Sequence, residues 1–103
     1  MTAFARLVSS SVVEQLRTPG RLGSVHSAFR QALNVETADG LLTVAGPSTG
    51  PLPNGLVLSA DADLSGYAAV EATSDGSALR IGALRIELRH ATYWTSCARS
   101  SVG

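Results

Sequence analysis

LGSVHSAFRQALNVETADGLLTV, residues 22–44, is the stretch that decides the fold. Its first part alternates, with apolar side chains at odd positions and polar ones at even positions: Val25, Phe29, Leu33 and Val35 against His26, Arg30 and Asn34. This period of two predicts a strand over residues 25–35 with one buried face. Asp39-Gly40 then precedes a second apolar run at residues 41–44, a strong hairpin signal because glycine accepts a positive φ.

The composition predicts one small β-rich domain. A chain of 103 residues is near the size at which a single core becomes self-sufficient. Hydrophobic residues make up 45% and aromatic residues only 5%, so Leu, Val, Ile and Ala must fill the interior. We expect the domain to span residues 1–94 and a C-terminal tail to follow at residues 95–103.

Charge is balanced overall but segregated along the chain. The net charge is zero, and all eight basic residues are arginines. Residues 1–35 carry +3, residues 36–75 carry −6 and residues 76–103 carry +3. Either acidic loops face basic strands within the fold, or a basic surface serves an anionic ligand. No nucleic-acid partner is expected, because no strong basic footprint is present and the aromatic residues are not interleaved with arginine.

The compartment expected from the sequence is the cytoplasm. Cys97 is the only cysteine, which rules out an intramolecular disulfide and gives no cysteine-based metal site. The apolar start of the chain is interrupted by Arg6 and three serines, unlike a secretory signal. No segment approaches the roughly 20 apolar residues that span a bilayer, so no membrane partner is expected.

A short helix is predicted at residues 10–18. Ser11 and Glu14 have the spacing of a capping box, and Pro19-Gly20 gives a stop. The apolar face of this helix comprises Val12, Val13 and Leu16. Because a helix of this length is marginal alone, we expect it to pack on the sheet or to plug one end of a barrel.

The rest of the chain predicts further short strands around one irregular loop. GPSTGPLPNG, residues 46–55, is too rich in Pro and Gly for a helix or a central strand. Strands are expected at residues 56–58, 67–72, 79–81 and 84–88, the last two either turning at Gly82-Ala83 or forming one strand bent there by a bulge. About six strands in all favour a mainly β fold, a small antiparallel barrel or sandwich with a short N-terminal helix.

Catalytic and metal signals are weak. His26 lies between Ser24 and Ser27, but neighbouring strand residues face opposite sides and no third group of a triad is evident. His90 lies 64 positions away and has no clear carboxylate partner. Asp61 and Asp63 resemble the start of a calcium loop whose ligand pattern does not continue. We therefore predict no metal site, no cofactor and no identifiable catalytic residue.

The loop at residues 46–55 is the better candidate for contact with a ligand. Gly50 and Gly55 would let backbone N–H groups approach an anion, with Asn54 beside them. Three prolines remove donors, however, and no Gly-Lys-Ser/Thr follows, so this is no phosphate-binding loop in the strict sense. Contact with a ligand or partner and a plain connection both stay open.

Five motifs carry a resemblance to a bacterial family: VHSAFRQALNV (25–35), DGLLTVAG (39–46), GPLPNGLVL (50–58), LRIGALRIEL (79–88) and ATYW (91–94). Their order resembles the AllH-like family of uncharacterised-domain proteins, which includes the third subunit of oxamate carbamoyltransferase in purine catabolism. The resemblance spans most of residues 20–94. Family members are longer, so the chain is similar to their N-terminal portion only, and its sequence after Trp94 lacks the family's proline-containing continuation.

The resemblance implies a role in a multi-subunit enzyme that interconverts oxalurate and phosphate with oxamate and carbamoyl phosphate. It implies the other carbamoyltransferase subunits as partners, anionic substrates, and an isolated chain that is inactive as an enzyme. Arg30, Gly50, Asn54 and Gly55 are the expected ligand-binding residues, since arginine suits carboxylate or phosphate. Two other hypotheses stay open: a stand-alone β-barrel module that binds a small anion, and a truncated nonfunctional fragment.

Overall fold

The computed structural model describes residues 1–94, which build a mainly β fold with one α-helix. The predicted tail at residues 95–103, with Cys97, lies outside the described residues. The elements in chain order are β1 (Thr2–Ser9), α1 (Ser10–Arg17), β2 (Gly20–Phe29), β3 (Ala32–Thr37), β4 (Gly40–Ala45), β5 (Gly55–Leu58), the 3-10 helix η1 (Ser65–Tyr67), β6 (Glu71–Ser74), β7 (Ala78–Ile81), β8 (Leu84–Glu87) and β9 (Thr92–Trp94).

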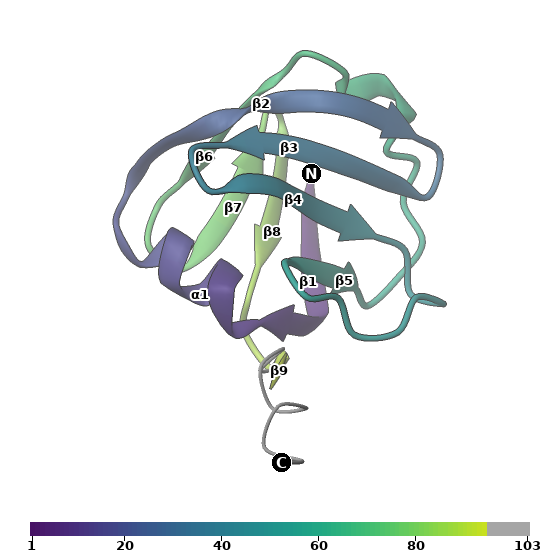
Figure 1. Cartoon of the computed structure of the whole chain (residues 1–103). Helices are drawn as coiled ribbons and strands as arrows, with labels where there is room; N and C mark the ends of the chain where they lie inside the picture. The colour runs from purple at the N-terminus through teal and green to yellow at the C-terminus, as the bar shows by residue number, and fades with distance from the viewer. Residues whose placement is uncertain (95–103) are drawn as a thin grey trace.

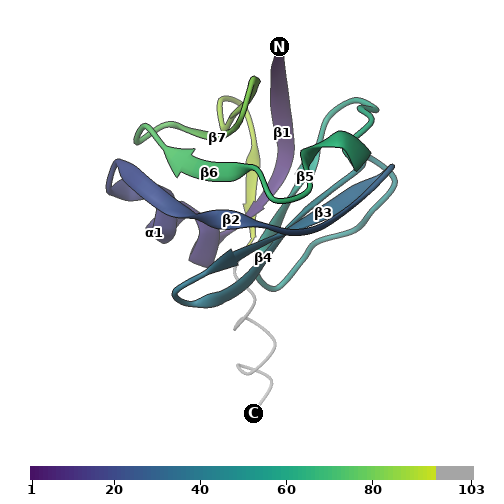
Figure 2. The same ribbon diagram turned by 90° about the horizontal axis from the view of Figure 1, so that it is seen from above.

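Eight of these strands close into a barrel (Figures 1 and 2). The order around the barrel is β5-β4-β3-β2-β6-β7-β8-β1, and pairing of β1 with β5 completes it. Most neighbours are antiparallel, while β1–β8, β4–β5 and β1–β9 are parallel. The barrel expected from the sequence is confirmed, with more strands than the six predicted.

One of the additional strands is β1, which the sequence did not reveal. β1 pairs with β5 along one edge, and with β8 and then β9 along the other. Its register with β5 shifts between Ala5 and Leu7, so the buried positions Ala5 and Val8 are three residues apart. A bulge of this kind breaks the alternation by which a strand is recognised.

The single strand predicted over residues 25–35 is wrong, because the chain turns at residues 30–31 between β2 and β3. Beside the turn, Ala28 pairs with Leu33, which would place even positions of β2 on the inner face. A register shift between Val25 and Ser27 then brings Val25 opposite Val35. The turn moves the inner face from odd to even positions, and the bulge moves it back to odd positions. The two shifts cancel, so the sequence alternates as a single strand would. Phe29 consequently lies at the hairpin tip and is 61% exposed.

The short helix is confirmed, with α1 ending at Arg17, one residue before the predicted end. Val12 and Leu16 are buried within the same cluster as the strand residues, so the helix plugs one end of the barrel (Figure 1). The predicted capping box is wrong. Ser9, not Ser11, occupies the N-cap position and makes no side-chain cap. Glu14 instead pairs with Arg17, at 3.1 Å between Oε2 and Nη2.

Two features of the second half also differ from or refine the predictions. The strand expected at residues 67–72 is wrong, because Ala69 adopts a positive φ of 67° and the extended segment β6 begins only at Glu71. At Gly82-Ala83, the chain forms two strands joined by a turn and not one bent strand. Gly82 has a φ of 61°, and β7 and β8 form a hairpin in which Ile81 pairs with Leu84.

The barrel interior is packed with aliphatic side chains, as the composition predicted. The central cluster of buried residues consists of Ala5, Val8, Val12, Leu16, Val25, Leu33, Val35, Leu42, Val44, Leu56, Leu58, Leu64, Ala72, Leu79, Ile81, Leu84, Ile86 and Leu88. Within residues 1–94, no helix has the length and apolar character that a membrane span requires. Because side chains fill the interior, a binding site on this barrel must be sought on its surface.

Candidate functional site

Asn54, in the loop between β4 and β5, makes hydrogen bonds within the protein through its side chain. Asn54 Oδ1 accepts hydrogen bonds from Ser11 Oγ at 2.7 Å and from Gln15 Nε2 at 2.9 Å. Asn54 Nδ2 donates to the Leu41 carbonyl at 2.7 Å. One half-buried side chain therefore joins the loop to α1 and to the start of β4, and its contacts are those of a structural support.

The two glycines of this loop differ in their surroundings. Gly55 donates its N–H to Ser9 Oγ at 3.0 Å, and a Cβ built on it would lie 2.4 Å from the Thr43 carbonyl oxygen. Gly55 is thus required for the close approach of β4 and β5. Gly50 is exposed, and a Cβ built there meets nothing within 4 Å.

Arg6 of β1 holds the outer part of the loop in place. Its Nη2 donates to the carbonyls of Pro47 and Thr49, at 2.9 and 2.8 Å. These carbonyls belong to a segment whose prolines cannot donate, so the arginine supplies the donors that the segment lacks. The loop is a well-anchored connection between two strands.

Arg30 lies elsewhere, in the turn between β2 and β3. It lines a shallow pocket of about 240 Å³ together with Gln31, Asp61, Ala62 and Asp63. Hydrogen bonds from the side chain and backbone of Ser65 lower the pKa of Asp63, and the charge of Arg30 lowers it further. The pocket therefore holds both signs of charge.

The structure does not bring the four expected ligand residues together. Ala32 pairs with Ala45 at the Arg30 end of β4, whereas Asn54 bonds to Leu41 at the other end of that strand. Asn54 and Gly55 are neighbours around the Ser9 and Ser11 hydroxyls. Arg30 is thus separated from Asn54 and Gly55 by the length of β4.

A different pocket collects three arginines that the sequence analysis did not single out. It has a volume of about 370 Å³ and lies between α1, the β6–β7 turn, the end of β8 and β9. We call it the arginine pocket, lined by Val13, Arg17, Gly76, Ser77, Arg85, Glu87, Leu88, Arg89 and Tyr93. Its lining contains three positive side chains and one negative one.

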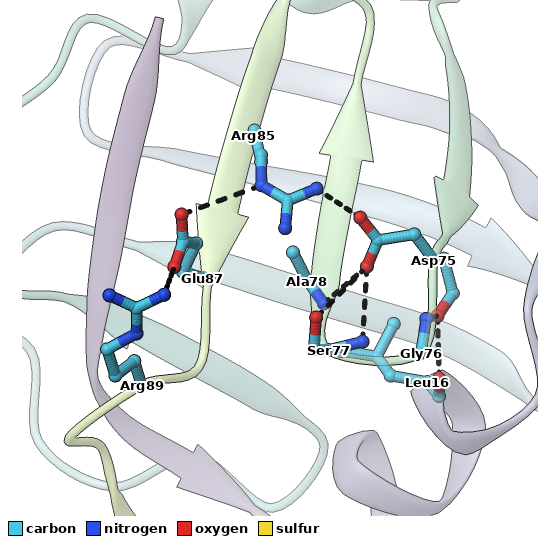
Figure 3. Close-up of polar contacts among 9 residues, drawn as sticks. Leu16, Asp75, Gly76, Ser77, Ala78, Arg85, Glu87 and Arg89 are labelled. Carbon is cyan, nitrogen blue, oxygen red and sulfur yellow. Dashed lines mark hydrogen bonds and ion pairs between the residues drawn. The ribbon is translucent and has the colours of Figure 1, made fainter.

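The centre of the arginine pocket is ordered by a chain of ion pairs (Figure 3). Arg85 Nη1 pairs with Asp75 Oδ2, and Arg85 Nε lies 3.6 Å from Glu87 Oε2. Glu87 Oε1 pairs in turn with Arg89 Nη2 at 3.1 Å. Glu87 therefore bridges the two guanidinium groups on the outer side of β8, and Asp75 orients the Arg85 group from the other side.

Asp75 is fixed by the turn that it begins. Its Oδ1 accepts the backbone N–H groups of Ser77 and Ala78, at 3.1 and 2.9 Å. These contacts lower the pKa of Asp75, first through the Ser77 backbone and then through Arg85. The pKa of Arg85 is raised chiefly by its hydrogen bond to Asp75. Both groups stay charged over the whole physiological range.

One sequence signal could have revealed part of the arginine pocket. Arg85, Glu87 and Arg89 alternate with buried Leu84, Ile86 and Leu88, which places the three charges along one exposed line of β8 and its continuation. Arg17 could not have been found in this way, because only the closure of the barrel brings α1 beside β8.

The other candidates have ordinary surroundings. His26 and His90 are exposed, and His90 has a left-handed φ of 66°. Among residues 1–94, no group of three or more His, Cys, Asp or Glu side chains is arranged to hold a metal ion. The segregated charges partly face one another, since Arg21 pairs with Glu71 and Arg85 with Asp75.

Comparison with protein families gives one clear result. Residues 4–93 match the AllH family N-terminal domain, which is most of the chain. Searches of curated proteins and of solved structures found no match. The chain belongs to the AllH family and corresponds to its N-terminal domain.

Proposed function

We propose that this AllH family N-terminal domain is the scaffold of a subunit associated with carbamoyl transfer in oxalurate and allantoin breakdown. It acts through contacts with the other subunits and does not catalyse the transfer alone. The observation that carries the proposal is the family match over residues 4–93. The link to carbamoyl transfer comes from the motif resemblance to the AllH-like family, because that family includes a subunit of oxamate carbamoyltransferase.

The tip of the β2–β3 hairpin is the contact surface that we favour. Phe29 is 61% exposed there, and Arg30 follows it. Aromatic residues and arginine are enriched at protein interfaces. Within the expected ligand set, Arg30 and Gly50 are exposed, whereas Asn54 and Gly55 support the loop.

Co-purification with the other two carbamoyltransferase subunits tests the proposal. We expect the tagged chain to retain both subunits, and a Phe29→Ser, Arg30→Gln double variant to lose at least tenfold in affinity for them, about 1.4 kcal/mol. Leu41→Ser is the matched control, because Leu41 is 49% exposed on a different part of the surface. Carbamoyl transfer should require the assembly.

A chain that stays monomeric with both subunits present would refute the scaffold role. Titration of the isolated chain with carbamoyl phosphate, oxamate and phosphate separates the remaining hypotheses. Saturable binding without the partners that is lost in an Arg30→Gln variant would favour the stand-alone anion-binding module instead.

A further inference from the structure

We infer that the arginine pocket is a binding site for a small organic dianion, a molecule with two acidic groups joined by a short carbon chain. This site goes beyond the scaffold role and does not depend on it. Arg17 and Arg89 would each hold one acidic group, while Arg85 lies between α1 and the end of β8 and is held by Asp75 and Glu87.

The arginines have more donors than their neighbours use. A guanidinium carries five N–H donors in a planar fork. Among the described residues, Arg17 reaches a carboxylate through Nη2 alone, and Arg89 does the same. Their side chains are 68% and 66% exposed. Both guanidinium groups can therefore rotate to present a bidentate pair of donors to an incoming carboxylate or phosphate.

The acidic side chains at the site are already occupied. Asp75 uses one oxygen for two backbone N–H groups and the other for Arg85. Glu87 divides its two oxygens between Arg85 and Arg89, and its side chain is 19% exposed. Glu14 pairs with Arg17 as Glu87 does with Arg89, so the outer arginines offer an incoming anion exposed and unused N–H donors, not an excess of positive charge. A dianion fits this arrangement, whereas a cation finds its acceptors occupied.

The remaining walls favour an organic molecule over an inorganic ion. Val13 of α1, Leu88 and the Tyr93 ring contribute apolar surface to the pocket. Its volume of about 370 Å³ is at the low end of ligand sites, where a metabolite fits and inorganic phosphate leaves most of the space empty. A short carbon chain between the two acidic groups would cover this apolar surface.

The site is also held rigid before a ligand arrives. The β6–β7 turn is tied by the two Asp75 hydrogen bonds, and the Leu88 N–H donates to the Ser77 carbonyl at 3.3 Å. Ser74 Oγ donates to the Leu16 carbonyl at 2.6 Å, which fixes the same turn against the end of α1. Binding then loses little conformational entropy outside the two outer arginine side chains.

Calorimetric titration of the 103-residue chain at low salt tests the site, with succinate and glutarate as dianionic probes. Succinamide is the uncharged analogue, and inorganic phosphate is the anion without a carbon chain. We expect at least one dianion to bind saturably, succinamide to show no binding and phosphate to bind at least tenfold more weakly. Arg17→Gln and Arg89→Gln should each weaken binding by about tenfold.

Arg21→Gln is the matched control, because Arg21 also makes one exposed ion pair, with Glu71, but lies outside the pocket. The affinity of the Arg21→Gln variant for the dianions should equal that of the wild type. In amide NMR spectra, the probes should shift Ser77, Leu88 and Tyr93, and the variant spectra will show that each protein is folded. Failure of both dianions to bind, equal loss in Arg21→Gln, equal binding of phosphate, or shifts centred on Arg30 would each overturn the inference.

Discussion

The loop at residues 46–55 and the arginine pocket show opposite uses of polar groups. The loop is rich in Gly, Pro and Asn, yet Asn54 spends all three of its hydrogen bonds on α1 and β4. The pocket is built from ordinary strand and helix residues, yet Arg17 and Arg89 each use one nitrogen for a carboxylate. An irregular sequence therefore marks a structural support here, and a regular one marks the exposed charge.

This difference shows why composition alone is a poor guide to a binding site. A polar side chain can serve a ligand only if the fold leaves its hydrogen-bonding groups unused. That condition depends on residues far away in the chain, such as Ser11 and Gln15 for Asn54. Three substitutions test how far the comparison holds.

The largest effect should come from Gly55, at the end of the loop. Gly55→Ala places a Cβ 2.4 Å from the Thr43 carbonyl and 2.8 Å from Leu52 Cδ1, so β4 and β5 must separate. We expect a loss of about 3 kcal/mol in the free energy of unfolding, measured by urea denaturation. Gly50→Ala is the control. It meets open space without a positive φ and should change stability by less than about 1 kcal/mol. Similar losses at both positions would contradict the packing role of Gly55.

Asn54→Ala should have the next largest effect. It removes three hydrogen bonds and leaves partners on α1 and β4 unsatisfied, for an expected loss of about 2 kcal/mol in the free energy of unfolding. Asn54→Asp keeps the oxygen that Ser11 and Gln15 contact but sets a carboxylate oxygen against the Leu41 carbonyl, so that two acceptors face each other. It should therefore also lower the free energy of unfolding. If Asn54→Ala leaves the free energy of unfolding unchanged, Asn54 is not a structural support and its side chain is available to a ligand.

The smallest effect should come from acidification at the arginine pocket. The pKa of Asp75 lies below its ordinary value of 3.8 in the folded chain. Its contribution to stability is therefore complete above the unfolded pKa and is lost as the pH falls through the lower folded value. Asp75→Asn should be less stable than the wild type at pH 7, and the gap should narrow at pH 3. Urea denaturation of both proteins at pH 7 and pH 3 measures this difference in stability. A difference that does not depend on pH would show that the charge of Asp75 is not involved.

Much of the architecture was predictable because local patterns and global fold agree. The aliphatic core, the hairpin at Gly40, the strand at residues 56–58 and the strand pair around Gly82 all follow from alternation and turn residues. The failures occurred where two parity changes cancelled between Val25 and Val35, and where a bulge disguised β1. Periodicity records only the net phase of a segment, so compensating shifts are invisible to it.

The candidate site was predictable only in part, for a related reason. The alternation of the strand predicts that Arg85, Glu87 and Arg89 lie on one side of the sheet. It does not predict that Arg17 lines the same pocket. Arg30 and Asn54 were expected to share a ligand, and the structure places them near opposite ends of β4. Proximity between elements is a property of the barrel's closure and not of any one segment.

The sequence by itself determined that this is a small β domain with an aliphatic interior, one short helix and the motifs of the AllH family. Each of these depends on local spacing or composition, which short stretches of chain carry in full. Only the tertiary structure decided that residues 22–44 form three strands, that β1 closes an eight-stranded barrel, and that three arginines share one pocket. These depend on long-range pairing, because β1 contacts β5, β8 and β9 across most of the chain.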